Sequence, residues 1–134
     1  DQTGHGKDVV VTRKDVNEIQ LAKGAIRAGV EILLQEVGLA GKEQAIDEFI
    51  VAGAFGTYIN LESAIRVGMF PDIPLERFQQ VGNAAGAGAR QMLISGDQRH
   101  FAQALVRELE YIELSAHPNF INEFSHNLFF HKAE

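Results

Sequence analysis

The clearest hydrophobic pattern in the chain is a helical stripe between residues 12 and 38. Apolar residues recur there at steps of three and four, as on one face of an amphipathic helix. Thr12, with Asp15 three residues later, forms a capping-box pattern at the start, and Gly38 supplies a stop. The pattern predicts one long helix whose buried stripe comprises Val16, Ile19, Ile26, Val30, Leu33, Leu34 and Val37.

Shorter apolar runs, bounded by glycine, proline or polar residues, predict strands and further helices. Strands are expected at 9–11, 49–52, 78–81 and 110–114. Helices are expected at 61–68, 84–95 and 98–108, with a last one opened by Pro118 that presents Phe120, Phe124 and Leu128 on one face. Strands that alternate with helices favour an α/β fold with a short central sheet.

Two glycine-rich motifs follow predicted strands. The first is Ile50-Val51-Ala52-Gly53-Ala54-Phe55-Gly56, and the second is the run from Val81 through Gly82 and Asn83 to Ala89. A strand that ends in glycine before a helix lets a ligand approach the backbone and directs the helix N-terminus toward it. The pair of motifs therefore predicts a nucleotide site.

Composition and charge narrow the class of protein. The chain has 134 residues, 46% of them hydrophobic, which suits one domain with a single core. The formal charge of −6, with both signs mixed along the sequence, argues against a nucleic-acid surface. No apolar run reaches the roughly 18 residues needed to span a bilayer, so no membrane role and a cytoplasmic location are expected. Residues 1–8 are interpreted as a linker or cut point, and residues 9–134 as one C-terminal subdomain.

The motifs, taken in order, resemble a known family. Val11-Thr12, Lys14-Asp15-Val16, Gln20-Leu21-Ala22-Lys23, the Gly53 turn and the Gly82–Arg90 run are similar to the C-terminal domain of the ATP-dependent reductive activators of corrinoid proteins. The similarity covers nearly the whole chain. It implies a ribonuclease H-like or actin-like ATPase subdomain, from the superfamily of sugar kinases, actin and heat-shock-cognate chaperones. It also implies an activity: return of an inactivated corrinoid cofactor to Co(I), with electron transfer coupled to ATP binding and hydrolysis.

The resemblance implies a set of nucleotide contacts. The chaperones have a Glu-Arg-Ala-Lys helix that reaches the adenosine, and Gln20-Leu21-Ala22-Lys23 occupies a similar place, with a spacing that puts Gln20 and Lys23 on one helical face. The superfamily's adenosine turn corresponds to the segment from Val51 to Gly56. The candidate contacts are Gln20, Lys23, Gly24, Gly53, Ala54, Phe55, Gly56 and Asn83. No catalytic residue is assigned.

Other parts of such a site are missing from the sequence. Two Asp-x-Gly hairpins hold Mg²⁺ and the phosphates of ATP in this superfamily, and neither occurs in the chain, which also lacks a Walker A loop. The resemblance places a [2Fe-2S] ferredoxin-like domain upstream, and the absence of cysteine excludes that cluster here. The chain is thus expected to form half of an ATP cleft. Its expected partners are the upstream domains, a corrinoid protein and, in the parent, a second copy in a homodimer.

Alternatives from other classes stay open. A small-molecule kinase fragment of the same superfamily would share the fold, and a non-catalytic interaction module would have lost the nucleotide. A metal site is disfavoured: His117, His126 and His131 gather near the C-terminus, and Glu123 stands three residues before His126, but a di-iron bundle needs that spacing twice.

Overall fold

A computed structural model describes residue 6 and residues 8–130, with the side chain of Phe55 outside the described part. The long helix α1 runs from Arg13 to Glu36. Both halves of the predicted capping box are present, since the Asp15 amide donates to the Thr12 hydroxyl oxygen at 3.3 Å and the Thr12 amide donates to the Asp15 carboxylate at 2.8 Å. Gly38, just past the helix, has φ +72°, as the predicted stop requires.

The sheet has two parallel strands, β1 (Phe49–Ala52) and β2 (Phe78–Gly82). Phe49 pairs with Phe78 and Ala52 with Gly82, and a register shift separates Val51 from Ala52. The crossover between the strands contains the helices α2 (Gly53–Tyr58) and α3 (Leu61–Arg66) and the turn η2 (Leu75–Arg77). Both strands, and the α/β class, are confirmed.

The main core lies where this crossover packs on the sheet. The residues buried there are Val51, Ala64, Met69, Phe70, Ile73 and Phe78. The rings of Phe49 and Phe70, and those of Phe49 and Phe78, have centroids 5.2 Å apart, a spacing at which tilted aromatic pairs attract. Ile26 of α1 packs against the same cluster. The core therefore fixes both strands, α3 and one side of α1.

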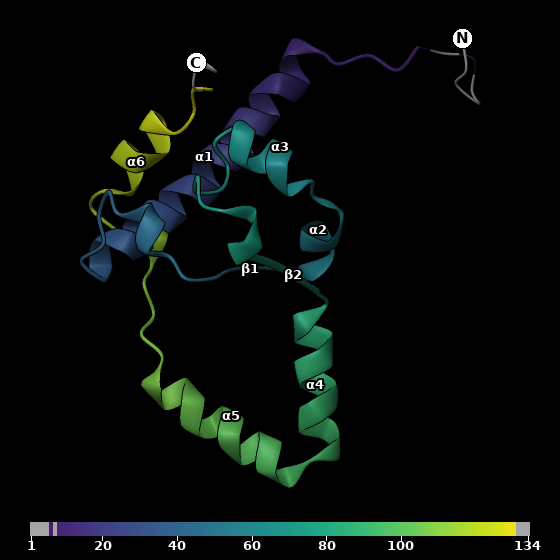
Figure 1. Cartoon of the computed structure of the whole chain (residues 1–134), viewed down its shortest axis with the longest axis vertical. Coiled ribbons are helices and arrows are strands. Elements are labelled where there is room, and N and C mark those ends of the chain that lie inside the picture. Colours follow the sequence, from purple (N-terminus) through teal and green to yellow (C-terminus); the bar gives the residue numbers. More distant parts are fainter. Residues whose placement is uncertain (1–5, 7, 131–134) are drawn as a thin grey trace.

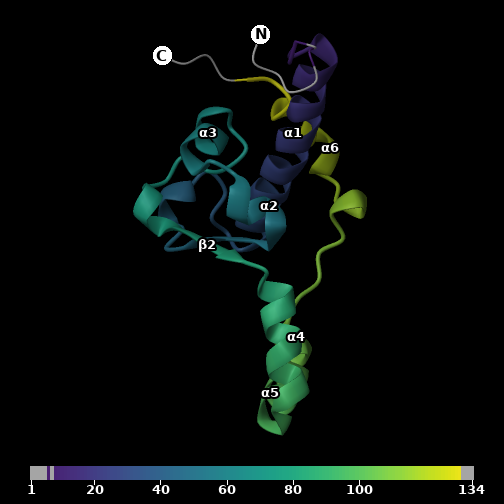
Figure 2. The same ribbon diagram turned by 90° about the vertical axis from the view of Figure 1, so that its right-hand side faces the viewer.

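A second layer lies on the other side of α1. Helix α6 (Phe120–His126) and the turn η3 (Leu114–Ala116) pack against α1, as Figures 1 and 2 show. Glycines on α1 allow these segments to lie close to the helix. A Cβ added at Gly24 would lie 3.2 Å from the Leu128 side chain, and one added at Gly29 would lie 3.4 Å from the Leu114 side chain. The stacked rings of Phe120 and Phe124 agree with their predicted common face.

The buried face of α1 differs from the predicted stripe. Val16, Ile19, Leu33 and Val37 are exposed, and of the predicted stripe only Leu34 is fully buried. The buried residues of the helix are Lys23, Gly24, Ala28, Gly29, Ile32 and Leu34. Periodicity counts large apolar side chains, whereas the contact with α6 is made through small ones, so the pattern identified the helix but not its closest contact.

The remaining helices form an arm. Helix α4 (Ala84–Ile94) follows β2, and α5 (Gly96–Glu108) turns back from its far end at an angle, so that the pair projects from the rest of the molecule (Figures 1 and 2). The helix predicted from residue 98 begins two residues earlier, because Ser95 caps it by accepting from the Gln98 amide at 3.3 Å. A further turn, η1 (Glu43–Ala45), precedes β1.

Two strand predictions are wrong. Residues 9–11 are exposed and carry no regular structure, and residues 110–114 contain only the first residue of η3. A strand needs a neighbour that satisfies its backbone groups, and the described residues offer none to either segment. The Gly53–Gly56 segment, predicted as a turn, is the first part of helix α2. Among the described residues, no helix is long and apolar enough to cross a membrane.

We predict that Gly56→Ala destabilises the chain by about 1–3 kcal/mol, because the added methyl group would overpack the fold. Its Cβ would lie 2.8 Å from the Val51 carbonyl oxygen, which is backbone and cannot rotate away. Gly88→Ala is the control, since it meets nothing within 4 Å and lies inside α4. Urea unfolding of both variants tests this, and equal midpoints would contradict the steric explanation.

Candidate functional site

The two glycine motifs meet at the carboxyl end of the sheet. Strand β1 ends at Ala52 and is followed directly by Gly53, which has φ +88° and begins α2, while β2 ends at Gly82, which has φ +61° and precedes α4. The parallel register places Ala52 opposite Gly82. The Thr57 hydroxyl oxygen lies 3.6 Å from the position of a Cβ at Gly82, so the two turns are in contact range. In open α/β sheets, ligands bind at this end of the strands.

Side-chain hydrogen bonds hold the two turns together. The Gln80 amide donates to the carbonyl oxygens of Gly56 and Ile59, the latter at 3.0 Å. The Thr57 hydroxyl donates to the Gly53 carbonyl at 3.3 Å. The Asn83 side chain accepts from the Gly86 amide at 2.9 Å and caps α4. These polar side chains form hydrogen bonds within the protein. A ligand at this edge would therefore contact mainly the backbone.

The two glycines of the first motif have different physical roles. A Cβ at Gly53 would meet nothing within 4 Å, so the backbone there is open to an approaching group. Gly56, in contrast, is buried and packs against the Val51 carbonyl. Ala54 is exposed beside Gly53. The structure thus brings four of the predicted contacts to one edge, namely Gly53, Ala54, Gly56 and Asn83. Close packing accounts for the glycine at position 56, and capping of α4 accounts for the asparagine at position 83.

Lys23 and Gly24 lie elsewhere, at the contact between α1 and the C-terminal segment. The Lys23 side chain is 0% exposed, its Nζ donates to the Phe129 carbonyl at 2.7 Å, and it sits 5.5 Å from the ring centroid of Phe130. Burial, with a smaller contribution from the Arg27 guanidinium, lowers the pKa of Lys23. Gln20 is half-buried on the same helix. A nucleotide would reach the Lys23 ammonium only if residues 128–130 moved away, so its adenosine contact stays a prediction.

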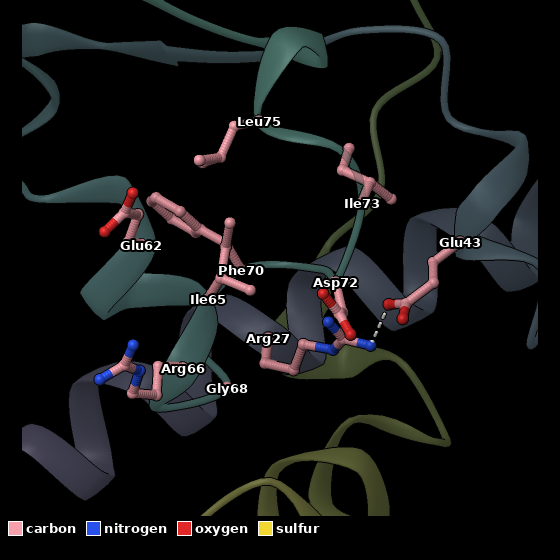
Figure 3. A pocket seen from close by; sticks show the side chains of 10 residues that line it. All are labelled: Arg27, Glu43, Glu62, Ile65, Arg66, Gly68, Phe70, Asp72, Ile73 and Leu75. Carbon is pink, nitrogen blue, oxygen red and sulfur yellow. Dashed lines mark hydrogen bonds and ion pairs between the residues drawn. The ribbon is translucent and has the colours of Figure 1, made fainter. Parts of the chain in front are cut away.

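A pocket of about 630 Å³ in the described residues lies apart from this edge (Figure 3). Its residues come from α1, α3, η1 and the loop before β2. Its walls combine the apolar residues Ile65, Phe70, Ile73 and Leu75 with the charged residues Arg27, Glu43, Glu62, Arg66 and Asp72. None of the predicted site residues lines it.

The charges of this pocket do not suit a phosphate. Arg27 is bound between the carboxylates of Glu31 and Glu43, each at 2.6 Å. Three of the five charged lining residues are acidic, which would repel an anion. The carboxyl edge of the sheet, with its open backbone, is therefore the better candidate for a nucleotide than this pocket.

The described residues contain no group of three or more histidine, cysteine, aspartate or glutamate side chains that could hold a metal ion. His117 is paired with Glu36 at 3.1 Å, and Glu123 accepts a hydrogen bond from Gln35 at 2.7 Å. His131 lies outside the described residues. Glu123 therefore stabilises the packing of α6 on α1.

The chain is similar to one protein family and to two corrinoid-related proteins. The family described as the C-terminal domain of RACo, the ASKHA domain, matches residues 1–134. The corrinoid activation enzyme RamQ of Eubacterium limosum is 37% identical over 125 residues, which cover 93% of this chain and 21% of that protein. The Co(II) methylated amine-specific corrinoid protein reductase of Methanosarcina barkeri is 35% identical over 89 residues, which cover 66% of this chain and 16% of that protein. The chain thus spans about a fifth of the length of the curated relatives it matches.

Sequence reasoning missed three residues that shape the edge: Thr57, Gln80 and Gly82. Gly82 was part of the second motif but was not selected as a contact, although its positive φ and its register opposite Ala52 make it the counterpart of Gly53. Gln80 follows no recognisable motif. It is a polar residue in the middle of the predicted strand 78–81, and only this position suggests that its side chain could reach a neighbouring segment.

The burial of Lys23 predicts a pH effect on stability. Because its pKa is lowered from 10.5 in the folded state, the unfolded chain binds more protons just below pH 10.5, and the free energy of unfolding rises with pH in that window. Lys23→Met lacks this rise, and we expect it to be at least as stable as the parent at pH 7. Urea unfolding from pH 7 to 10.5 measures the difference, with Lys42→Met, at an exposed site, as control. Parallel curves for the parent and Lys23→Met would contradict the prediction.

Proposed function

The chain belongs to the family of C-terminal ASKHA domains of RACo, and from this we propose that it forms one side of the ATP cleft in a reductive activator of corrinoid proteins. The printed names of two relatives, a corrinoid activation enzyme and a Co(II) corrinoid protein reductase, support this assignment. The observation on which the proposal depends most is the carboxyl edge of the sheet, where Gly53 and Gly82 both have positive φ and a helix follows each.

In this proposal the adenosine of ATP lies against the open backbone at Gly53. Exposed Ala54 and Asn83, the N-cap of α4, border the same surface. A flat base and sugar need close approach to main chain more than they need charge, and an open glycine permits that approach. The cations and acidic groups that phosphates and Mg²⁺ require do not gather at this edge, so we assign them to the preceding part of the protein.

The chain would bind and orient the nucleotide and would not carry the electron. Reduction of Co(II) to Co(I) needs a one-electron donor, and a [2Fe-2S] cluster requires thiolate ligands. The chain has no cysteine, so it cannot hold such a cluster, which we place in the preceding domains. The contribution of this chain is then to link ATP binding to the position of those domains.

The position of Lys23 separates the predicted nucleotide contacts into two groups, those at the glycine edge and those on α1. The glycine edge is open, whereas Lys23 is covered by the C-terminal segment. We therefore assign the adenosine contact to the glycine edge first. Contacts with Gln20 and Lys23 belong to a second state, in which residues 128–130 have left α1, whereas Gly24 also faces Phe124 and Asn127.

The chain alone should bind nucleotide weakly. We predict dissociation constants above about 0.1 mM for both ATP and ADP, with little preference, because the phosphates lack partners at this edge. Isothermal calorimetry on the 134-residue chain measures both constants. Tight binding, or a strong preference for ATP, would show that the chain holds a phosphate site of its own.

In the full-length protein, Gly53→Val should reduce ATP-dependent activation of the corrinoid protein at least tenfold. The branched side chain would fill the open space against which we place the adenosine. Gly41→Val is a matched control, since Gly41 also has positive φ, also meets nothing within 4 Å, and lies before β1. Both variants carry backbone strain of about 1–3 kcal/mol.

The rate of Co(I) formation at saturating ATP, followed by absorbance, tests the comparison. Retained activity in Gly41→Val with loss in Gly53→Val supports the proposed site. Equal losses would assign the effect to backbone strain, and full activity in Gly53→Val would exclude this edge as the nucleotide site.

A further inference from the structure

The α4–α5 arm has no core of its own. Neither helix contains a buried residue, and large apolar side chains are exposed along both, including Leu93 (80% exposed), Ile94, Phe101 and Val106. The helices have 11 and 13 residues, lengths at which isolated helices are marginal in water. Apart from their mutual contact they project away from the body (Figure 2). A pair of this kind needs a partner surface to be stable.

The segment that follows the arm has the properties of an unpaired strand. Residues 109–113 read Leu-Glu-Tyr-Ile-Glu, and the backbone is extended at both Leu109 and Glu113. Within the described part of the chain, no backbone amide of these residues donates to a carbonyl of another segment. Leu109 and Tyr111, two residues apart, are both exposed, Tyr111 by 83%. The segment runs alone from α5 to η3 (Figure 1).

The surface of the whole chain is also large. Its accessible area is 10281 Å². A compact monomer of 14.7 kDa is expected to expose about 6,900 Å². Among the described residues the sheet has two strands, fewer than most sheets contain.

We propose that the α4–α5 arm and residues 109–113 form one docking surface for the preceding part of the same polypeptide, with residues 109–113 added as a strand to a sheet edge there. This inference rests on the proposed function, in which that part supplies the other wall of the cleft. The family occupies the C-terminus of its members, and the chain spans 21% and 16% of two relatives, so most of such a polypeptide precedes this domain.

The position of the arm favours the preceding region over a second copy. Helix α4 begins at Ala84, directly after its cap Asn83 at the same carboxyl edge as Gly53, so the arm borders the proposed cleft. A partner that covers the arm also faces that edge. The region that must bring the phosphate-binding groups to the edge is therefore in place to bury the apolar side chains of α4 and α5. Strand addition then supplies main-chain hydrogen bonds to the amides of residues 109–113.

Site-specific photocrosslinking in the full-length protein tests the proposal. Benzoylphenylalanine replaces Phe101 on the arm or Tyr111 in the extended segment, and replaces Ile121 on α6 as a control at another exposed apolar position. Isotope-mixed protein separates crosslinks within one polypeptide from those between two copies. We expect the two test positions to crosslink to residues preceding this domain in the same polypeptide, at least tenfold more often than the control.

Amide exchange of the same protein gives a second readout. Amides of residues 109–113 should exchange at least tenfold more slowly than in an unstructured peptide. Tyr111→Pro, which removes a donor, should abolish this protection, while Tyr111→Ala should keep most of it. Crosslinks between copies would overturn the proposal in favour of a dimer, and absent crosslinks with fast exchange would overturn it outright. Neither readout uses nucleotide, so failure here is distinct from failure of the proposed ATP site.

Discussion

The parallel pairing of β1 with β2 is the constraint on which the candidate site depends. Parallel strands run in the same direction, so the ends that follow Ala52 and Gly82 come to the same edge of the sheet. Each strand is followed by a helix, and a glycine with positive φ allows each turn. The aromatic cluster of Phe49, Phe70 and Phe78 fixes the opposite end of the same strands. Packing at one end of the sheet thereby holds the open backbone at the other.

Helix α1 links this unit to the C-terminal segment. One side of it meets the core through Ile26, and another meets α6 through Gly24 and η3 through Gly29. Lys23 is buried at this second contact, where its charge is compensated by a single carbonyl and an aromatic ring. A buried ammonium with so few partners is a weak point of the packing.

The sequence predicted the parts of the fold that local patterns encode. The capping box at Thr12, the strand from Phe49 and the alanine-rich helix after Asn83 each have signals within a few residues. The failures concern long-range partners. Residues 110–114 have the alternation of a strand, but pairing depends on a neighbour that no local pattern supplies. The burial of Lys23 depends on Phe129, 106 residues away, and a lysine on a helix gives no sign of it. The sequence predicted the two glycine turns of the candidate site. It did not predict that Thr57 and Gln80 bring these turns into contact.

The central claim is that the nucleotide lies against the carboxyl edge of β1 and β2. Photoaffinity labelling of the full-length protein with an azido-adenine analogue of ATP, followed by peptide mapping, tests it most directly. We predict that label competed by ATP is found in the peptides that contain residues 53–60 or 82–86. Label found instead around the charged pocket of Glu62, Arg66 and Asp72, or no competed label in this domain, would contradict the account.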